Sequence, residues 1–107
     1  MNFDCFDASL QLITDLRGPL KRLRRADRKL FTQLTTASSS IALNIAEGRG
    51  RAGQDQRHHW RIAFGSAEEV RAILLVAERF EYFGAEESEA ARGTLKRLLA
   101  MLWRMTH

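Results

Sequence analysis

The sequence has one cysteine, one proline and no apolar run long enough to cross a membrane. The single cysteine, Cys5, excludes an internal disulfide and is compatible with a reducing cytoplasm, where we expect the protein. The longest wholly apolar stretch covers residues 72–77, far short of the ~20 residues that span a bilayer. The first residues also lack the basic and apolar segments of a signal peptide. The single proline, Pro19, favours long helices.

Charge is distributed unevenly along the 107 residues. The formal net charge is +4, but residues 17–61 contain eleven Lys or Arg and three acidic residues, a local balance of +8. The remainder contains six basic and ten acidic residues, a balance of −4. Such an asymmetry favours a surface that faces a polyanion. The alternative interpretation is a pair of well-solvated helix ends.

Apolar residues at helical spacing predict four helices in one domain that covers residues 1–107. The four segments span about 6–23, 27–47, 53–82 and 85–105. We expect breaks near residues 18–26, 48–53 and 83–86. Gly18 and Pro19 should kink or interrupt the first segment, and Asp27 should cap the second. Gly48 and Gly50 should end the second segment, because glycine adopts the left-handed conformation that closes helices.

The apolar stripes define a core and a surplus of apolar surface. The residues that should be mainly buried are Leu34, Ile41, Ile45, Trp60, Ala63, Leu74, Leu95, Leu98 and Leu102. The third helix is apolar over more of its surface than one small core needs, because of Phe64, Ile73, Val76, Phe80 and Phe83. The flank formed by Leu99 and Trp103 adds to this surplus. Part of this surface is therefore expected to face another subunit.

Two short blocks carry a family resemblance. Residues 41–51 include Asn44-Ile45-Ala46-Glu47-Gly48, and residues 62–69 read Ile-Ala-Phe-Gly-Ser-Ala-Glu-Glu. They resemble the paired signatures of the four-helix-bundle proteins encoded in intervening sequences of large-subunit ribosomal RNA genes. That family is related to the accessory variability protein of diversity-generating retroelements. The resemblance spans nearly the whole chain, and it implies an all-α, antiparallel four-helix bundle that assembles into a homo-oligomeric barrel, preferably a pentamer.

Asn44 and Glu47 are the polar residues of the first block. They lie three residues apart, on one helical face, among apolar neighbours. We therefore expect them to be partly buried and structural, fixing helix register and bonding loop backbone or an arginine. The alternative is acid–base catalysis with carboxylates such as Glu68 and Glu69. Because no coherent catalytic constellation accompanies them, the sequence predicts no catalytic residue and no enzyme.

The chain also lacks a recognisable metal or cofactor motif. His58 and His59 are adjacent, so their side chains point ~100° apart on a helix and cannot easily chelate one ion. Nothing in the sequence places a base beside Cys5, so a packed thiol is the better interpretation. The Gly48-Arg49-Gly50-Arg51 turn lacks the strand and the Gly-Lys-Ser/Thr ending of a phosphate-binding loop. We expect no metal and no cofactor.

The basic tract at residues 20–29 is amphipathic and could bind a membrane surface or a nucleic acid. Its leucines are needed for the core and no large aromatic residue anchors it, so RNA or DNA backbone is the preferred ligand, with no membrane partner. The candidate binding residues, within one subunit or across neighbours, are Arg22, Arg24, Arg25, Arg28, Arg49 and Arg51. The predicted function is a non-enzymatic nucleic-acid-binding or ribonucleoprotein accessory protein. The alternative is an oligomeric scaffold that docks an acidic protein partner such as a reverse transcriptase.

Overall fold

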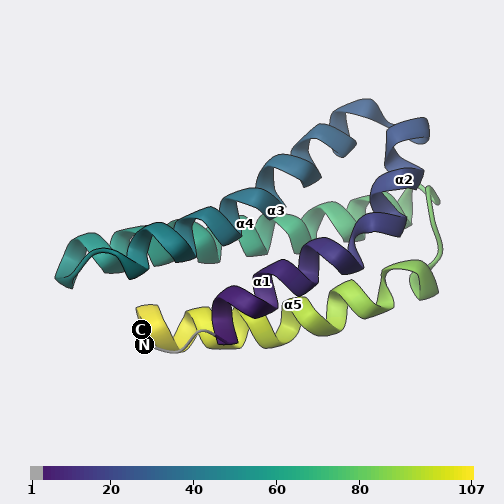
Figure 1. The fold of residues 1–107 in the computed structure, drawn as a ribbon. Coiled ribbons are helices and arrows are strands. Elements are labelled where there is room, and N and C mark those ends of the chain that lie inside the picture. Colours follow the sequence, from purple (N-terminus) through teal and green to yellow (C-terminus); the bar gives the residue numbers. More distant parts are fainter. Residues whose placement is uncertain (1–3) are drawn as a thin grey trace.

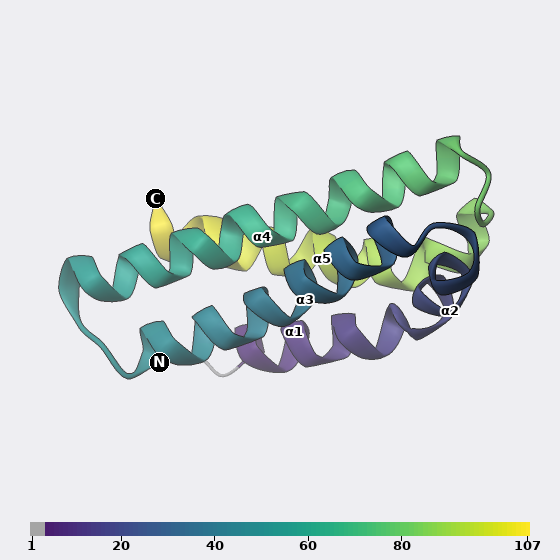
Figure 2. The same cartoon turned by 90° about the horizontal axis from the view of Figure 1, so that it is seen from above.

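The computed structural model describes residues 4–107, which form five α-helices and no β-strand. The helices are α1 (Asp4–Asp15), α2 (Arg17–Ala26), α3 (Arg28–Arg49), α4 (Gly53–Arg79) and α5 (Ala85–Thr106). Four of them run antiparallel along a bundle of 42 × 22 × 20 Å, while α2 crosses one end (Figures 1 and 2). In this bundle α3 packs on α4, α4 packs on α5, and α1 packs on both α3 and α5. The predicted helical class is confirmed.

The chain has one helix more than predicted because the first segment divides at Leu16. The Leu16 amide is shared between the carbonyls of Leu12 (2.9 Å) and Ile13 (3.2 Å), which tightens the last turn of α1. Pro19 lies in the first turn of α2, where an amide has no intrahelical partner and its absence costs little. The breaks therefore occur at Leu16 and Asp27, on either side of the predicted interval 18–26.

The core is a single cluster of buried side chains from all five helices. Of the nine residues predicted to be buried, eight are, and Trp60 is half-buried. Ile73 and Phe83 are each only 5% exposed, so the apolar surplus predicted for the third helix is smaller than expected. Val76 and Phe80 remain exposed. None of the helices described for residues 4–107 combines the length and apolar character that crossing a bilayer requires.

Asp27 joins two turns at the end of the bundle that carries α2. One carboxylate oxygen accepts a hydrogen bond from the Leu30 amide (3.0 Å), which caps α3 as predicted. The other accepts a hydrogen bond from the Tyr82 hydroxyl (3.1 Å), beyond the end of α4. This side chain therefore ties the α2–α3 corner to the α4–α5 connection.

The α3–α4 turn is closed differently from the prediction. Gly48 lies inside α3, and Gly50, which ends that helix, has a φ of −82°, outside the left-handed region. The positive φ occurs at Gly53, at 59°. The glycine in the left-handed conformation is therefore Gly53, three residues after Gly50.

Helix α4 ends in a Schellman motif that contains no glycine. The Tyr82 amide bonds the Ala77 carbonyl (3.0 Å), and the Glu81 amide bonds the Glu78 carbonyl (2.9 Å). Glu81 has a φ of 62°, a left-handed conformation that costs a residue with a Cβ atom about 1–2 kcal/mol. Gly84 lies beyond this motif, between α4 and α5, where it is the N-cap residue of α5.

Replacing Glu81 with glycine should therefore stabilise the fold. We expect Glu81→Gly to raise the free energy of unfolding by about 0.5–1 kcal/mol, because relief of the strained φ outweighs the added freedom of the unfolded chain. Urea-induced unfolding followed by circular dichroism measures this change. Glu81→Ala is the control, since it removes the carboxylate but keeps the Cβ atom. An equal gain in both variants would show that charge, and not backbone conformation, is responsible.

Candidate nucleic-acid interface

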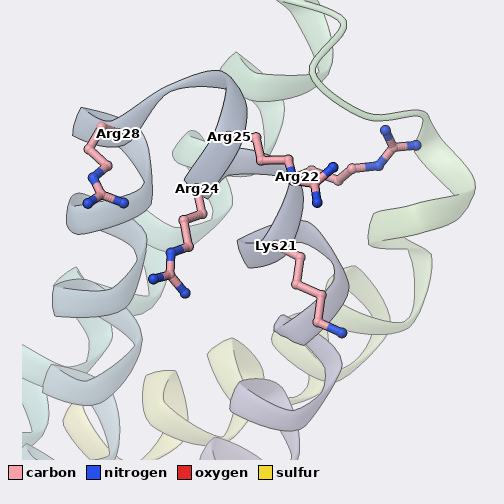
Figure 3. A pocket seen from close by; sticks show the side chains of 5 residues that line it. All are labelled: Lys21, Arg22, Arg24, Arg25 and Arg28. Atoms are coloured by element: carbon pink, nitrogen blue, oxygen red, sulfur yellow. The ribbon is translucent and has the colours of Figure 1, made fainter.

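Helix α2 and the start of α3 present four basic side chains on one corner of the bundle. Pro19 and Leu23 are buried on the inner face of α2, Leu20 packs partly against the core, and the basic side chains of the helix are exposed. We call the group formed by Lys21, Arg24, Arg25 and Arg28 the basic corner. These residues, with Arg22, line one open depression (Figure 3). Arg24 extends into the space between α2 and α3, on the same side as Arg28.

The residues of the basic corner are exposed and have no acidic partner within ion-pair distance among residues 4–107. Four neighbouring positive charges without countercharges repel one another, so binding of an anion there is favourable. Lys21 was not among the predicted site residues. Its spacing of three and four residues from Arg24 and Arg25 was the signal that could have placed it there.

Arg22 differs from its neighbours because it is engaged within the fold. Its guanidinium donates two hydrogen bonds to the Glu87 carboxylate, at 2.8 and 3.1 Å, and it points away from Arg24 toward the start of α5 (Figure 3). The hydrogen bond from Arg22, followed by that from the Gly84 amide, holds the pKa of Glu87 below its ordinary value. Arg22 therefore fastens α2 to α5 and is a weaker candidate for binding phosphate.

Arg49 and Arg51 lie at the opposite end of the bundle. Helix α3 has 22 residues and begins at Arg28, so its length of about 30 Å, at 1.5 Å per residue, lies between Arg28 and this end. Arg51 also bridges Glu47 (3.1 Å) and Asp55 (2.7 Å), which supports the turn between α3 and α4. The six predicted arginines therefore do not form one surface within one subunit, and only assembly could bring the two ends together.

Asn44 links α3 to α4 and does not pair with Glu47. Its amide nitrogen donates to the Ser40 carbonyl (3.0 Å) and the Ser40 hydroxyl (3.1 Å). Its side-chain carbonyl oxygen lies 3.1 Å from Nδ1 of His59. Because that oxygen can only accept, Nδ1 of His59 carries a proton and donates it. The Ser66 hydroxyl completes the chain by donating to Ser40 Oγ (3.0 Å).

The prediction that Glu47 is partly buried is wrong. Its side chain is 53% exposed and pairs with Arg51, so it bonds an arginine as expected, but in solvent. The error arose because Glu47 projects from the outer face of α3, although Ile45 and Gly48 on either side of it are buried.

Trp60 and Gly48 bring the two helices close together. The Trp60 indole nitrogen donates to the Ile45 carbonyl at 3.3 Å. A Cβ atom on Gly48 would lie 2.6 Å from that nitrogen and 3.1 Å from the Gln56 carbonyl oxygen, so a larger residue would displace the indole. We call this set of contacts the α3–α4 seam. The seam consists of Ser40, Asn44, Ile45, Gly48, His59, Trp60 and Ser66.

Each of the two sequence blocks contributes residues to this helix–helix contact: Asn44, Ile45 and Gly48 come from the first block, and Ser66 comes from the second. His59, considered in the sequence only as a poor metal ligand, is half-buried and bonded to Asn44. The bond between Ser66 and Ser40 was not predicted, although the place of Ser66 in the second block could have pointed to it. Glu68 lies 3.1 Å from Arg71 and Glu69 is exposed, so these two carboxylates do not converge on Asn44.

Two further observations concern groups outside the basic corner and the seam. Burial raises the pKa of the Cys5 thiol to about 11, which keeps it protonated at neutral pH and poorly nucleophilic. Among residues 4–107, no three His, Cys, Asp or Glu side chains come together in a group that could hold a metal ion. The electrostatic feature that stands out from the rest of the surface is the basic corner.

Comparison of this chain with known proteins identifies its family and a solved structure with the same fold. The family model described as 23S rRNA-intervening sequence protein matches residues 2–104. The chain is similar to the crystal structure of a protein with unknown function, from the S23 ribosomal protein family of Bacteroides thetaiotaomicron. That likeness has a TM-score of 0.84 at 23% identity, and it covers 95% of this chain and 97% of the other, so it shows the fold. None of the curated proteins compared matches the chain.

The structure predicts different consequences for the two polar residues of the first block, because Asn44 belongs to the seam and Glu47 does not. Asn44→Ala should lower the free energy of unfolding by about 1–3 kcal/mol, because it leaves the half-buried acceptors of Ser40 and the half-buried donor of His59 without their partner. Glu47→Ala is the matched control and should cost at most about 1 kcal/mol, since an exposed ion pair contributes little. Thermal unfolding measures both variants. Equal melting temperatures for Asn44→Ala and the wild type would contradict a structural role for Asn44.

Proposed function

Because this chain belongs to the 23S rRNA-intervening sequence protein family, we propose that it is a non-enzymatic protein that binds the backbone of RNA or DNA. The observation that carries this proposal is the basic corner, where exposed cations gather without acidic partners. The family's link to ribosomal RNA genes makes RNA, within a ribonucleoprotein, the ligand to test first. Binding rather than catalysis is proposed because the corner offers positive charge and no acid–base pair.

The mechanism is charge neutralisation of phosphates. The guanidinium groups of Arg24, Arg25 and Arg28 can each donate two parallel hydrogen bonds to phosphate oxygens, and Lys21 adds a point charge. Each phosphate that is neutralised releases condensed counterions, so affinity falls as salt is added. Contacts of this kind position a backbone and carry little base information. The proposed activity is therefore strong at low salt and weakly dependent on sequence.

We also propose that several copies assemble. Leu43 is 68% exposed and directly precedes the seam residue Asn44. Ile62 is 38% exposed and lies about one turn after His59, which bonds Asn44. Large aliphatic side chains at such exposure are stabilised when a second copy covers them. A ring would repeat the basic corner around one nucleic acid, and simultaneous engagement of several corners would raise the overall affinity. A pentamer is the preferred assembly because of the family resemblance.

Binding should depend on the basic corner. The variant Arg24→Gln/Arg25→Gln/Arg28→Gln should weaken binding to unrelated RNA sequences by similar factors, because it removes phosphate contacts. Wild-type affinity should fall steeply between about 50 and 200 mM salt, and the variant should lose about three from the slope of log affinity against log salt. Fluorescence anisotropy with labelled RNA and DNA measures both quantities.

The matched control is Arg61→Gln/Arg97→Gln/Arg104→Gln. It removes the same charge from exposed positions on α4 and α5, so it separates the effect of the corner from the effect of net charge. Equal binding by the corner variant and the wild type, or no binding by the wild type at about 50 mM salt, would contradict the proposal. Capture of an acidic protein such as a reverse transcriptase by the same corner would then be the preferred explanation.

Sedimentation velocity at micromolar concentration should show a homo-oligomer. A Leu43→Ser/Ile62→Ser variant should shift the protein toward the monomer, because the two substitutions remove apolar area from the proposed contact. Leu10→Ser is a suitable control, since Leu10 is an exposed leucine on α1. A wild-type species of about 12 kDa at all concentrations would contradict assembly.

A further inference from the structure

The end of α4 carries an exposed aromatic ring beside the basic end of the bundle. Phe80 is 63% exposed, and its ring stacks on that of Tyr82 with centroids 5.3 Å apart and an interplanar angle of 15°. One face of the ring is thus covered by Tyr82. Leu75, Val76, Arg79 and Phe80 together line a shallow depression. An exposed aromatic ring with aliphatic neighbours and an adjacent guanidinium offers an apolar surface of the kind on which nucleic-acid bases stack.

Contacts within the fold connect this ring to the basic corner. Tyr82, which stacks on Phe80, donates to the Asp27 carboxylate at 3.1 Å. Asp27 lies between α2 and α3, two residues from Arg25 and next to Arg28. The end of α4 and helix α2 also occupy the same end of the bundle (Figures 1 and 2). A flexible strand of several nucleotides held by the corner is therefore near enough to reach the ring.

Lys29, in the first turn of α3, is a further cation at this end of the bundle. It precedes Ser40 by eleven residues, which is about three helical turns, so both occupy the same side of α3. Ser40 contacts Ser66 of α4, and Phe80 follows Ser66 by fourteen residues, about four turns along the same side. Since α3 and α4 are antiparallel, Lys29 and Phe80 lie toward the same end of the bundle, on the helix sides that carry Ser40 and Ser66. Lys29 is exposed, and none of the ion pairs found among residues 4–107 involves it.

We propose that this end of the bundle binds single-stranded nucleic acid, with an unpaired base stacked on Phe80 and the flanking phosphates held by Lys29 and the basic corner. The inference rests on the proposed function and adds its substrate class. A duplex keeps its bases stacked on one another and cannot offer one to Phe80, whereas a single strand can. Every base has an apolar face, so stacking adds affinity without requiring a particular sequence.

The test replaces Phe80 with leucine and with tyrosine. Phe80→Leu keeps an apolar side chain but loses the flat ring, and it should weaken binding of a single strand of about 15 nucleotides roughly 5- to 150-fold. Binding of a duplex of the same sequence should not change. Phe80→Tyr should bind as the wild type does, because it restores the ring. The probes are labelled single-stranded RNA, single-stranded DNA and duplex RNA, and tighter binding of RNA than of DNA would identify the 2′-hydroxyl as a contact.

Several outcomes would overturn the inference, and they are separable from failure of the proposed function. If Phe80→Leu binds single strands normally while the triple arginine variant does not, backbone binding stands and base stacking fails. If the wild type binds duplex as tightly as single strand, stacking also fails. If Phe80→Leu lowers the sedimentation coefficient, the ring belongs to a contact between copies. If the wild type binds no nucleic acid, both proposals fail together. Circular dichroism confirms that each variant is folded.

Discussion

The close approach of α3 and α4 is the constraint on which the rest of the bundle depends. Gly48 leaves space for the Trp60 indole, and the contacts from Ser66 through Ser40 and Asn44 to His59 fix the register of the two helices. With that register set, the inner face of α4 carries Leu74 toward the core, where α5 adds Leu98. A shift of one residue along either helix would separate the polar partners and leave them unsatisfied inside the contact.

Asp27 and Arg22 extend this order to the end of the bundle. Asp27 caps α3 and receives the Tyr82 hydroxyl, while Arg22 binds Glu87 at the start of α5. Both contacts use charged groups to hold α2 across the end of the bundle. The remaining basic residues of α2 take no part in these contacts and are exposed. This end of the bundle therefore combines ion-pair and hydrogen-bond contacts that hold α2 with a positive surface beside them.

The sequence predicted the helical class, most of the core and two of the three turns, because apolar periodicity and capping residues act over short distances. It did not predict the division at Leu16, because the apolar stripe continues through the break. It misplaced Glu47, because sequence neighbours do not reveal which face of a helix a charge occupies. It placed six arginines in one candidate site, although the length of α3 separates Arg49 and Arg51 from the rest. A helix over residues 27–47 rises about 1.5 Å per residue, so the predicted segment already implied this separation. Grouping the arginines by charge alone overlooked it.

The two signature blocks and the candidate site lie in different parts of the molecule. Asn44, Gly48 and Ser66 belong to the α3–α4 seam, so the motif that identifies the family explains why the chain folds as it does. The basic corner lies beyond that seam, on α2 and the first turn of α3. A protein could share the seam and lack the corner, since no seam contact requires a cation on α2. Family membership therefore supports the fold, and nucleic-acid binding must be tested on the charges and the exposed ring of this chain itself.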